Sequence, residues 1–219
     1  MSRASAWPRA LRRFGPDHDG ADVSSAPTVL VLGAEAAMAC AVAFELARAA
    51  DRGCALLCVW EPSGRVRPGW TAGASRPARR EALRLQARGL PARADGRLAR
   101  VALGDGAAEA ATTAERVIGA AGVPVVVALL GPRPGAFDPL LEDTGLVVVA
   151  TPPDSAVGAL AGIELAHLRA PVARCSWTPG PLARPLVLAG RLGLGAAAAE
   201  LRAALAGLSQ SGRPRADAA

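Results

Sequence analysis

The chain has 219 residues, of which 51% are hydrophobic and 20% charged, so it is long enough for one sizeable domain with a buried core. All 25 positive side chains are arginine, lysine is absent, and the formal net charge is +6. The absence of lysine excludes Schiff-base chemistry and also excludes the lysine with which a Walker A loop contacts phosphates.

The N-terminal residues 1–26 are rich in Arg, Asp, Ser and Pro and are predicted to form a disordered basic arm. This arm lacks the apolar core of a signal peptide, and no uncharged run in the chain reaches the roughly 18 residues of a membrane span. We therefore expect a cytoplasmic protein, with recruitment to a membrane by a partner left open.

Alternating apolar runs and amphipathic stretches make up residues 27–208, which we predict to form a single domain. Residues 28–32 and 54–60 are continuous apolar runs, and the stretch 36–50 between them has helical periodicity. This order predicts a βαβ unit. Continuous apolar strands are typical of a parallel sheet that is covered by helices on both faces.

The same alternation continues toward the C-terminus. We expect a helix after Asp105, with Asp105 as its N-cap, and a second helix from a capping box at 151–154 to residue 168. Further strands are expected at 100–103, 123–130 and 146–150, edge strands at 171–177 and 186–189, a short element at 137–142, a helix at 196–208, and a disordered tail at 209–219. The predicted fold is a doubly wound, mostly parallel α/β domain, either P-loop NTPase-like or Rossmann-like.

Four cysteines lie in apolar segments, at Cys40, Cys54, Cys58 and Cys175. Cys54 and Cys58 are separated by three residues, one more than in a zinc or redox pair, and on a strand they would lie too far apart for a disulfide. We expect buried free thiols and no metal site.

Three stretches in this order resemble the MinD/ParA-like P-loop NTPases, and in particular their CpaE-like branch of septum-site and pilus-assembly proteins. Residues 29–50 stand where the family has its first strand, phosphate loop and helix. Residues 55–64 look like the second strand with its "D-x-D-P-x-G" ending. Residues 125–134 and 146–152 look like the "VVVD-x-PPG" and "LVVVxTP" strands. The resemblance covers roughly residues 28 to 170.

The positions that this resemblance assigns to the phosphate loop lack its chemistry. Ala34 stands at the signature lysine, Ala39 at the catalytic lysine, and Cys40 at the serine or threonine that binds Mg²⁺. Met38 replaces a glycine, and Glu35 places a negative charge where phosphates would lie, although Gly33 is retained. A phosphate cradle needs bare backbone N–H groups and a cation, so these substitutions predict loss of binding.

Most of the acidic residues that the family has at its strand ends are also replaced in this chain. Val59 replaces one acid after the second strand, Glu61 retains the other, and Ala128 falls near the Walker B aspartate. Without Mg²⁺ ligands or lysines, hydrolysis would lack its transition-state stabilisation. We therefore expect a degenerate domain with no catalytic residue, no cofactor and no metal.

An Arg-rich insertion is predicted at residues 64–100, which contain ten arginines and two acidic residues. Arginines spaced four apart would share one helix face that could bind an acidic partner protein, nucleic-acid phosphate or an anionic membrane. The alternative is a solvated helix face in an Arg-biased composition. The candidate interaction residues are Arg76, Arg79, Arg80, Arg84 and Arg88.

Two further patterns are weaker. Residues 193–198 match the dinucleotide pattern G-x-G-x-x-A, but too little chain follows for a strand with the ribose-binding acid, so a Gly-rich entry into a helix is favoured. Glu164 and His167 would lie one helical turn apart, and surface or rim packing is favoured for them over catalysis.

The resemblance implies a non-catalytic interaction or positioning protein that acts in division-site placement, chromosome segregation, or secretion or pilus assembly. Its expected partner is a protein with an acidic surface, and a homodimer is left open. One alternative is a small Rossmann-like enzyme or cofactor-binding protein. Another is sequence-independent DNA binding through the Arg-rich segment.

Overall fold

The computed structural model describes residues 26–33, 35–61, 73–130, 133–142, 144–150 and 170–211. Several predictions lie outside these residues: the basic arm, Ala34, the capping box at 151–154, and the following helix with Glu164 and His167.

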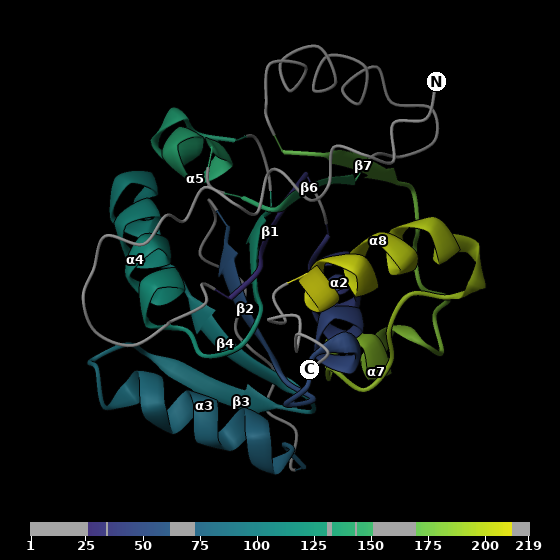
Figure 1. The fold of residues 1–219 in the computed structure, drawn as a ribbon, viewed down its shortest axis with the longest axis horizontal. Helices are drawn as coiled ribbons and strands as arrows, with labels where there is room; N and C mark the ends of the chain where they lie inside the picture. Colours follow the sequence, from purple (N-terminus) through teal and green to yellow (C-terminus); the bar gives the residue numbers. More distant parts are fainter. Residues whose placement is uncertain are drawn as a thin grey trace, which may run out of the picture.

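Seven strands form a single sheet (Figure 1). They are β1 (Thr28–Leu32), β2 (Ala55–Trp60), β3 (Ala92–Asp95), β4 (Leu98–Ala102), β5 (Val125–Leu129), β6 (Leu146–Ala150) and β7 (Val172–Cys175). Their order across the sheet is β3-β4-β2-β5-β1-β6-β7, and every neighbouring pair is parallel except β3 and β4. This confirms the predicted doubly wound, mostly parallel α/β fold.

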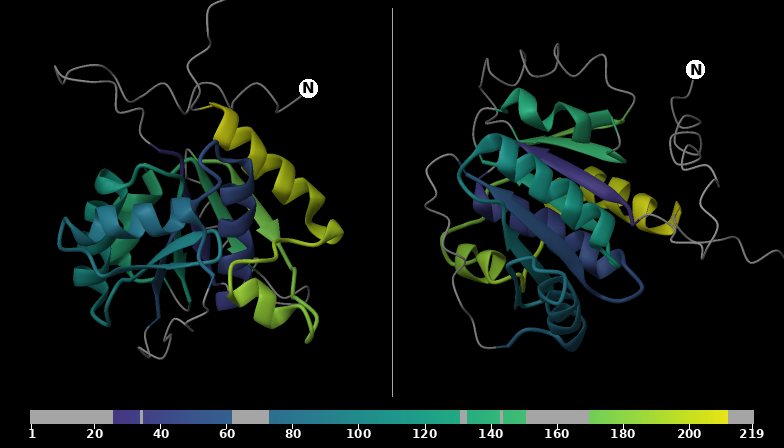
Figure 2. Two further views of the ribbon diagram at one scale, coloured as in Figure 1. Left: turned by 90° about the horizontal axis from the view of Figure 1, so that it is seen from below. Right: turned by 90° about the vertical axis from the view of Figure 1, so that its left-hand side faces the viewer.

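Helices cover both faces of the sheet (Figure 2). The six α-helices that the structure describes are α2 (Ala36–Ala49), α3 (Arg76–Gln86), α4 (Ala107–Ala120), α5 (Asp138–Glu142), α7 (Arg184–Leu188) and α8 (Ala199–Ser211). Successive residues of a strand point to opposite faces. Leu30 and Leu32 of β1 therefore join a core with α3, α4 and α5, whereas Val29 and Val31 join a second core with α2, α7 and α8. This explains why the central strands are apolar at every position.

Strand β1 lies at the centre of the sheet, between β5 and β6. Strand β5 also pairs with β2, so it separates β1 from β2. In the usual dinucleotide-binding order the first two strands are direct neighbours. The strand order of this chain therefore differs from that arrangement.

Strand β3 was not anticipated from the sequence. It pairs antiparallel with β4 through a two-residue turn, in which Gly96 has φ +54°. The turn consists of Gly96 and Arg97, and glycine at the first position of a two-residue turn is a known hairpin signal. The described part of the Arg-rich segment thus contributes α3 and two strands to the fold.

Three expectations about element boundaries are wrong. Residues 186–189 were expected to form a strand, but Leu186–Leu188 belong to α7, which has a proline in its first turn; an apolar run this short does not distinguish the two. The N-cap of α4 is Gly106, so Asp105 does not cap it. Helix α8 extends to Ser211, into the predicted tail.

Candidate functional site at the β1–α2 junction

The carboxyl end of β1 is the place where the fold would bind a ligand, because doubly wound sheets bind ligands where the strand order reverses. The chain leaves β1 through Gly33, which has φ +66° and whose backbone N–H donates to the carbonyl of Leu129 at 3.1 Å. A Cβ at Gly33 would lie 3.4 Å from the carbonyl oxygen of Ala150. The strand end is therefore closely packed against both neighbouring strands.

Helix α2 begins at Ala36, only a few residues after β1 ends. Met38, Ala39 and Cys40 lie within this helix and are at most 3% exposed. The backbone N–H of Ala39 donates to the carbonyl of Glu35 at 3.2 Å, as in a regular helix. Residues 38–40, which the resemblance assigns to the end of the phosphate loop, are therefore helical and packed against the sheet.

Glu35 is the N-cap residue of α2, and its side chain makes no capping hydrogen bond. Its carboxylate is 64% exposed and lies 3.0 Å from the guanidinium of Arg184 on α7. A carboxylate at a helix N-terminus interacts favourably with the helix dipole. The carboxylate of Glu35 therefore lies at the helix N-terminus, where the resemblance would place a phosphate. The nearby cation, Arg184, is paired with this carboxylate.

Glu61 is the last described residue after β2. Trp60 is buried and packs against Phe137, with ring centroids 5.6 Å apart, and Glu61 follows it. Ala128, which the resemblance places near the Walker B aspartate, is fully buried. Within the described ranges, no three His, Cys, Asp or Glu side chains are grouped closely enough to hold a metal ion.

The four cysteines are free thiols; Cys40, Cys54 and Cys58 are buried as expected, whereas Cys175 is only half-buried. Burial raises the pKa of Cys54 to about 11 and also raises the pKa of Cys58. Burial also raises the pKa of Cys40, although the guanidinium of Arg100, which donates to Sγ at 3.4 Å, opposes this effect. The thiolate is the reactive form of cysteine. These thiols are therefore protonated and unreactive near neutral pH.

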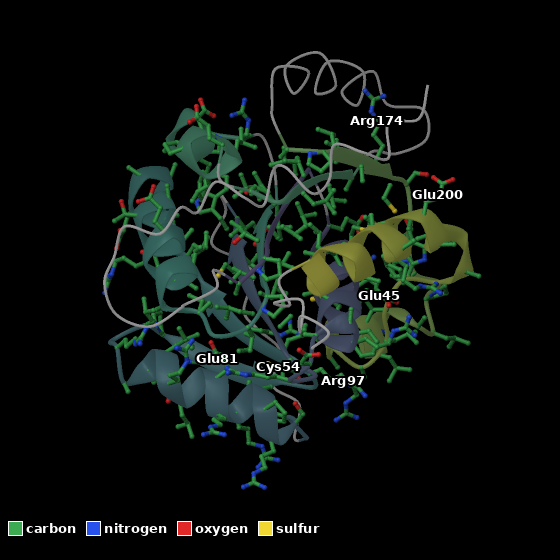
Figure 3. The ribbon with its side chains drawn as sticks, viewed as in Figure 1. Glu45, Cys54, Glu81, Arg97, Arg174 and Glu200 are labelled. Atoms are coloured by element: carbon green, nitrogen blue, oxygen red, sulfur yellow. The ribbon has the colours of Figure 1, made fainter. Side chains whose placement is uncertain are left out.

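Of the arginines predicted to share one face of the helix, those toward its C-terminal end contact other groups of the protein. Arg84 forms two hydrogen bonds to the buried carboxylate of Glu81, at 2.7 and 3.0 Å. Glu81 also accepts a hydrogen bond from the backbone N–H of Gly122, beyond the end of α4, at 3.0 Å. In Figure 3, Glu81 lies on the side of α3 that faces the rest of the molecule.

Two further arginines donate to carbonyls at the same end of α4. Arg88 donates to Ala120 at 3.1 Å, and Arg52 donates to Gly122 at 2.9 Å. Carbonyls at a helix C-terminus lack helical partners and carry partial negative charge. Arg88 thus satisfies an internal group of the fold, which its position in the sequence did not reveal.

Arg100 lies between β4, α2 and α7. Its guanidinium is 3.4 Å from the carboxylate of Asp95 and donates to the carbonyl of Leu188. Its side chain is only 12% exposed. By contrast, Arg76, Arg79 and Arg80 lie exposed in the first turns of α3, and only Arg79 donates a side-chain hydrogen bond, to Ala74 at 2.9 Å.

The dinucleotide-like pattern at 193–198 lies beside α2. A Cβ at Gly193 would clash with the side chains of Glu45 and Phe44. Glu45, labelled in Figure 3, is buried and lies near Arg48 and Arg202. Arg202 donates to the carbonyls of residues 194 and 195. The close approach of this segment to α2 therefore accounts for Gly193.

Comparison with known proteins adds no relative: no protein-family model and no curated protein matches the chain. Among the helices that the structure describes, none has both the length and the apolar character needed to cross a bilayer.

Proposed function

We propose that this chain is a non-catalytic interaction or positioning protein built on a degenerate MinD/ParA-like domain. The processes that the resemblance implies are division-site placement, chromosome segregation, and secretion or pilus assembly. The observation that carries the proposal is the β1–α2 junction. There, residues 38–40, at the end of the segment that would cradle phosphate, lie in a buried helix, and Glu35 occupies its entrance.

The strand order favours this proposal over a dinucleotide-binding enzyme. Strand β5 separates β1 from β2, unlike in the usual dinucleotide-binding sheet. The one glycine pattern that suggested a dinucleotide is explained by the packing of Gly193 against α2. Neither observation supports a cofactor site.

The arginines of α3 give less support to DNA binding than the sequence suggested. Arg84 and Arg88 contact groups of the protein itself, so the stripe of four exposed arginines is reduced to its N-terminal half. Binding to duplex DNA depends on many simultaneous phosphate contacts. This favours a protein partner over sequence-independent binding along DNA.

Calorimetric titration of the full chain with Mg²⁺–ATP tests the proposal. We expect no binding stronger than about 1 mM, because the chain has no lysine and Glu35 places a carboxylate where phosphates would lie. Mg²⁺-dependent binding in the micromolar range would contradict the proposal. A parallel thermal-shift measurement with NAD, NADP and FAD should show no stabilisation; a clear shift with any of them would favour the cofactor-binding alternative.

A further inference from the structure

The two edges of the sheet differ in how the hydrogen bonds of their backbone are satisfied. At the edge formed by β3, the backbone N–H of Ala92 donates to the carbonyl of Leu90 at 2.8 Å. The carbonyl of Ala92 accepts a hydrogen bond from the side chain of Gln86 at 2.6 Å, and α3 packs against this strand. An edge that makes its hydrogen bonds locally and is covered by a helix is protected from pairing with another strand.

Strand β7 forms the opposite edge, and no other described strand pairs with its outer side. The backbone N–H of Val147 donates to the carbonyl of Pro171, so the alternate residues 171, 173 and 175 form the ladder with β6. The N–H and carbonyl groups of Val172 and Arg174 therefore point to the open side. A strand edge of this kind is a template for pairing with a further strand.

The open edge is longer than β7 itself. Along residues 171–178 the exposure alternates residue by residue, with the even-numbered residues exposed and the odd-numbered ones half-buried. A period of two is that of an extended chain. Ala173, Cys175 and Trp177 pack against the core that contains α8, whereas Arg174 extends from β7 on the side away from α8 (Figure 3).

We propose that residues 172–178 pair with the same residues of a second copy of this chain, antiparallel and about a two-fold axis at Cys175. The contact joins the two sheets edge to edge, and it is isologous, as the interface of a two-fold dimer must be. This inference goes beyond the proposed function and does not depend on it.

The side chains on the face away from α8 fit this register. Arg174 lies opposite the partner's Ser176, so each guanidinium faces a hydroxyl and not a second cation. Val172, which is 39% exposed, lies opposite the partner's Thr178, and β-branched side chains pack well in such cross-strand pairs. Like charges directly opposite each other destabilise a strand pair, and residues 172–178 contain one charged side chain, which this register separates from its copy.

The side chains on the face that carries α8 fit the same register. Ala173 lies opposite the partner's Trp177, so a methyl group faces an indole ring. Cys175 lies on the axis, opposite the partner's Cys175. In an antiparallel pair of this kind, which is not hydrogen-bonded, the two Cα atoms are about 4.5 Å apart, a distance that a disulfide can span. The pairing therefore places a chemical marker on its own axis.

The other two-fold registers fit less well. An axis at Ala173 would pair fewer residues, because it ends at Pro171, which has no N–H to donate. An axis at Trp177 would set two indole rings opposite each other and would bring Pro179 into the ladder. The axis at Cys175 avoids both prolines.

Sedimentation velocity of the full chain between about 1 and 200 µM tests the proposal, and we expect a dimer that dissociates on dilution. Ser176 is exposed beyond the end of β7, so it can be replaced without disturbing the sheet. Ser176→Glu should tighten the dimer about threefold or more, because two ion pairs with Arg174 form across the axis, and Ser176→Arg should weaken it as much. The matched controls, Thr112→Glu and Thr112→Arg on the exposed side of α4, should leave the dimer unchanged.

Oxidation of the full chain with diamide tests the register. The two Cys175 thiols give up two protons and two electrons to this diazene, which becomes a hydrazine, and the sulfur atoms join in a disulfide. A non-reducing gel should show a covalent dimer. Cys175→Ser should abolish this band but retain the dimer in sedimentation, since the buried Cys40, Cys54 and Cys58 remain in both chains.

Three outcomes would overturn the inference. The first is a monomer at every concentration, which would also be the result if another protein, or residues of this chain outside the described ranges, occupied the edge. The second is a dimer that both Ser176 variants leave unchanged, because it would then use another surface. The third is a dimer that diamide does not link through Cys175. All three leave the Mg²⁺–ATP titration untouched, so failure here is distinguishable from failure of the proposed function.

Discussion

The arginines of the segment 76–100 fall into two groups with different environments. Arg84, Arg88 and Arg100 donate to carboxylates or carbonyls of the protein, whereas Arg76 and Arg80, within the described part of the chain, form no ion pair. The sequence presents all of them as one basic stretch. The difference shows that a run of arginines can be divided between stabilising the fold and facing solvent.

The division follows from where acceptors lie. The first group donates to Glu81, to the carbonyl of Ala120 at the end of α4, and to the carbonyl of Leu188 at the end of α7. The second group lies in the first turns of α3, where the helix dipole is positive; there Arg79 donates to the carbonyl of Ala74, but Arg76 and Arg80 form no ion pair with the described residues. Substitutions in each group test whether the two groups contribute differently to stability.

The largest expected effect is that of Arg100→Ala. The substitution removes a mostly buried guanidinium and leaves the charge of Asp95 without this partner. Breaking a buried ion pair in this way costs about 3–5 kcal/mol. Urea unfolding followed by circular dichroism measures the loss, with Arg116→Ala on the exposed face of α4 as the control. A loss below about 1 kcal/mol would place Arg100 in the solvent-facing group.

A smaller loss is expected for Glu81→Ala. Glu81 is 4% exposed and accepts hydrogen bonds from Arg84 and from the backbone N–H of Gly122. Hydrogen bonds to a charged group contribute about 2 kcal/mol, and the half-exposed Arg84 can regain water. Differential scanning calorimetry should show a lower Tm, and Glu81→Gln should recover part of it. Equal stability of Glu81→Ala and the original chain would contradict the role assigned to Glu81.

Arg88→Ala should have an effect of about 1 kcal/mol. Arg88 donates to Ala120 in the last turn of α4, where a cation satisfies a carbonyl and interacts with the helix dipole. Because Arg88 is itself exposed, the loss should shrink in high salt. Amide hydrogen exchange should accelerate most near the end of α4. Uniform acceleration over the whole sheet would instead indicate a global role.

The smallest effect, and the only one with the opposite sign, is expected for Arg76→Ala/Arg80→Ala. Removing positive charge from the first turns of α3 relieves an unfavourable interaction with the helix dipole. We expect the free energy of unfolding to increase by a few tenths of a kcal/mol, and the increase should reach about 0.5 kcal/mol at low salt. Chemical denaturation at two salt concentrations measures it. A clear loss of stability would show that these arginines also have partners in the fold.

The main architecture was predictable because its strands are distinctive. The continuous apolar runs of β1, β5 and β6, four or five residues long, are typical of the middle of a sheet that is covered on both faces. The spacing of those strands then leaves room for helices between them. The short strand β3, with Arg93 and Asp95 among alanines, has no such signal apart from the glycine in the turn that follows it.

The candidate site was less predictable, because it depends on contacts between distant residues. The substitutions at Ala39 and Cys40 indicated a lost phosphate loop, but not that these positions would be buried in a helix. Similarly, Arg88 reaches Ala120 over 32 residues, and Arg100 reaches Leu188 over 88. Spacing along one helix says nothing about such partners. Residues 186–189 were assigned to a strand instead of to α7, because four apolar residues fit a strand or a helix equally well.

The place of β5 between β1 and β2 has a consequence for the order of folding during synthesis. Strand β1 is made early, but its two strand partners are β5 and β6, which lie about a hundred residues later in the chain. Until these emerge from the ribosome, the backbone of β1 has no sheet to join, whereas β3 and β4 can pair as soon as both are made. Long-range pairings of this kind form late and slow folding. Among the described strands, β1 is therefore one of the last to be incorporated into the sheet.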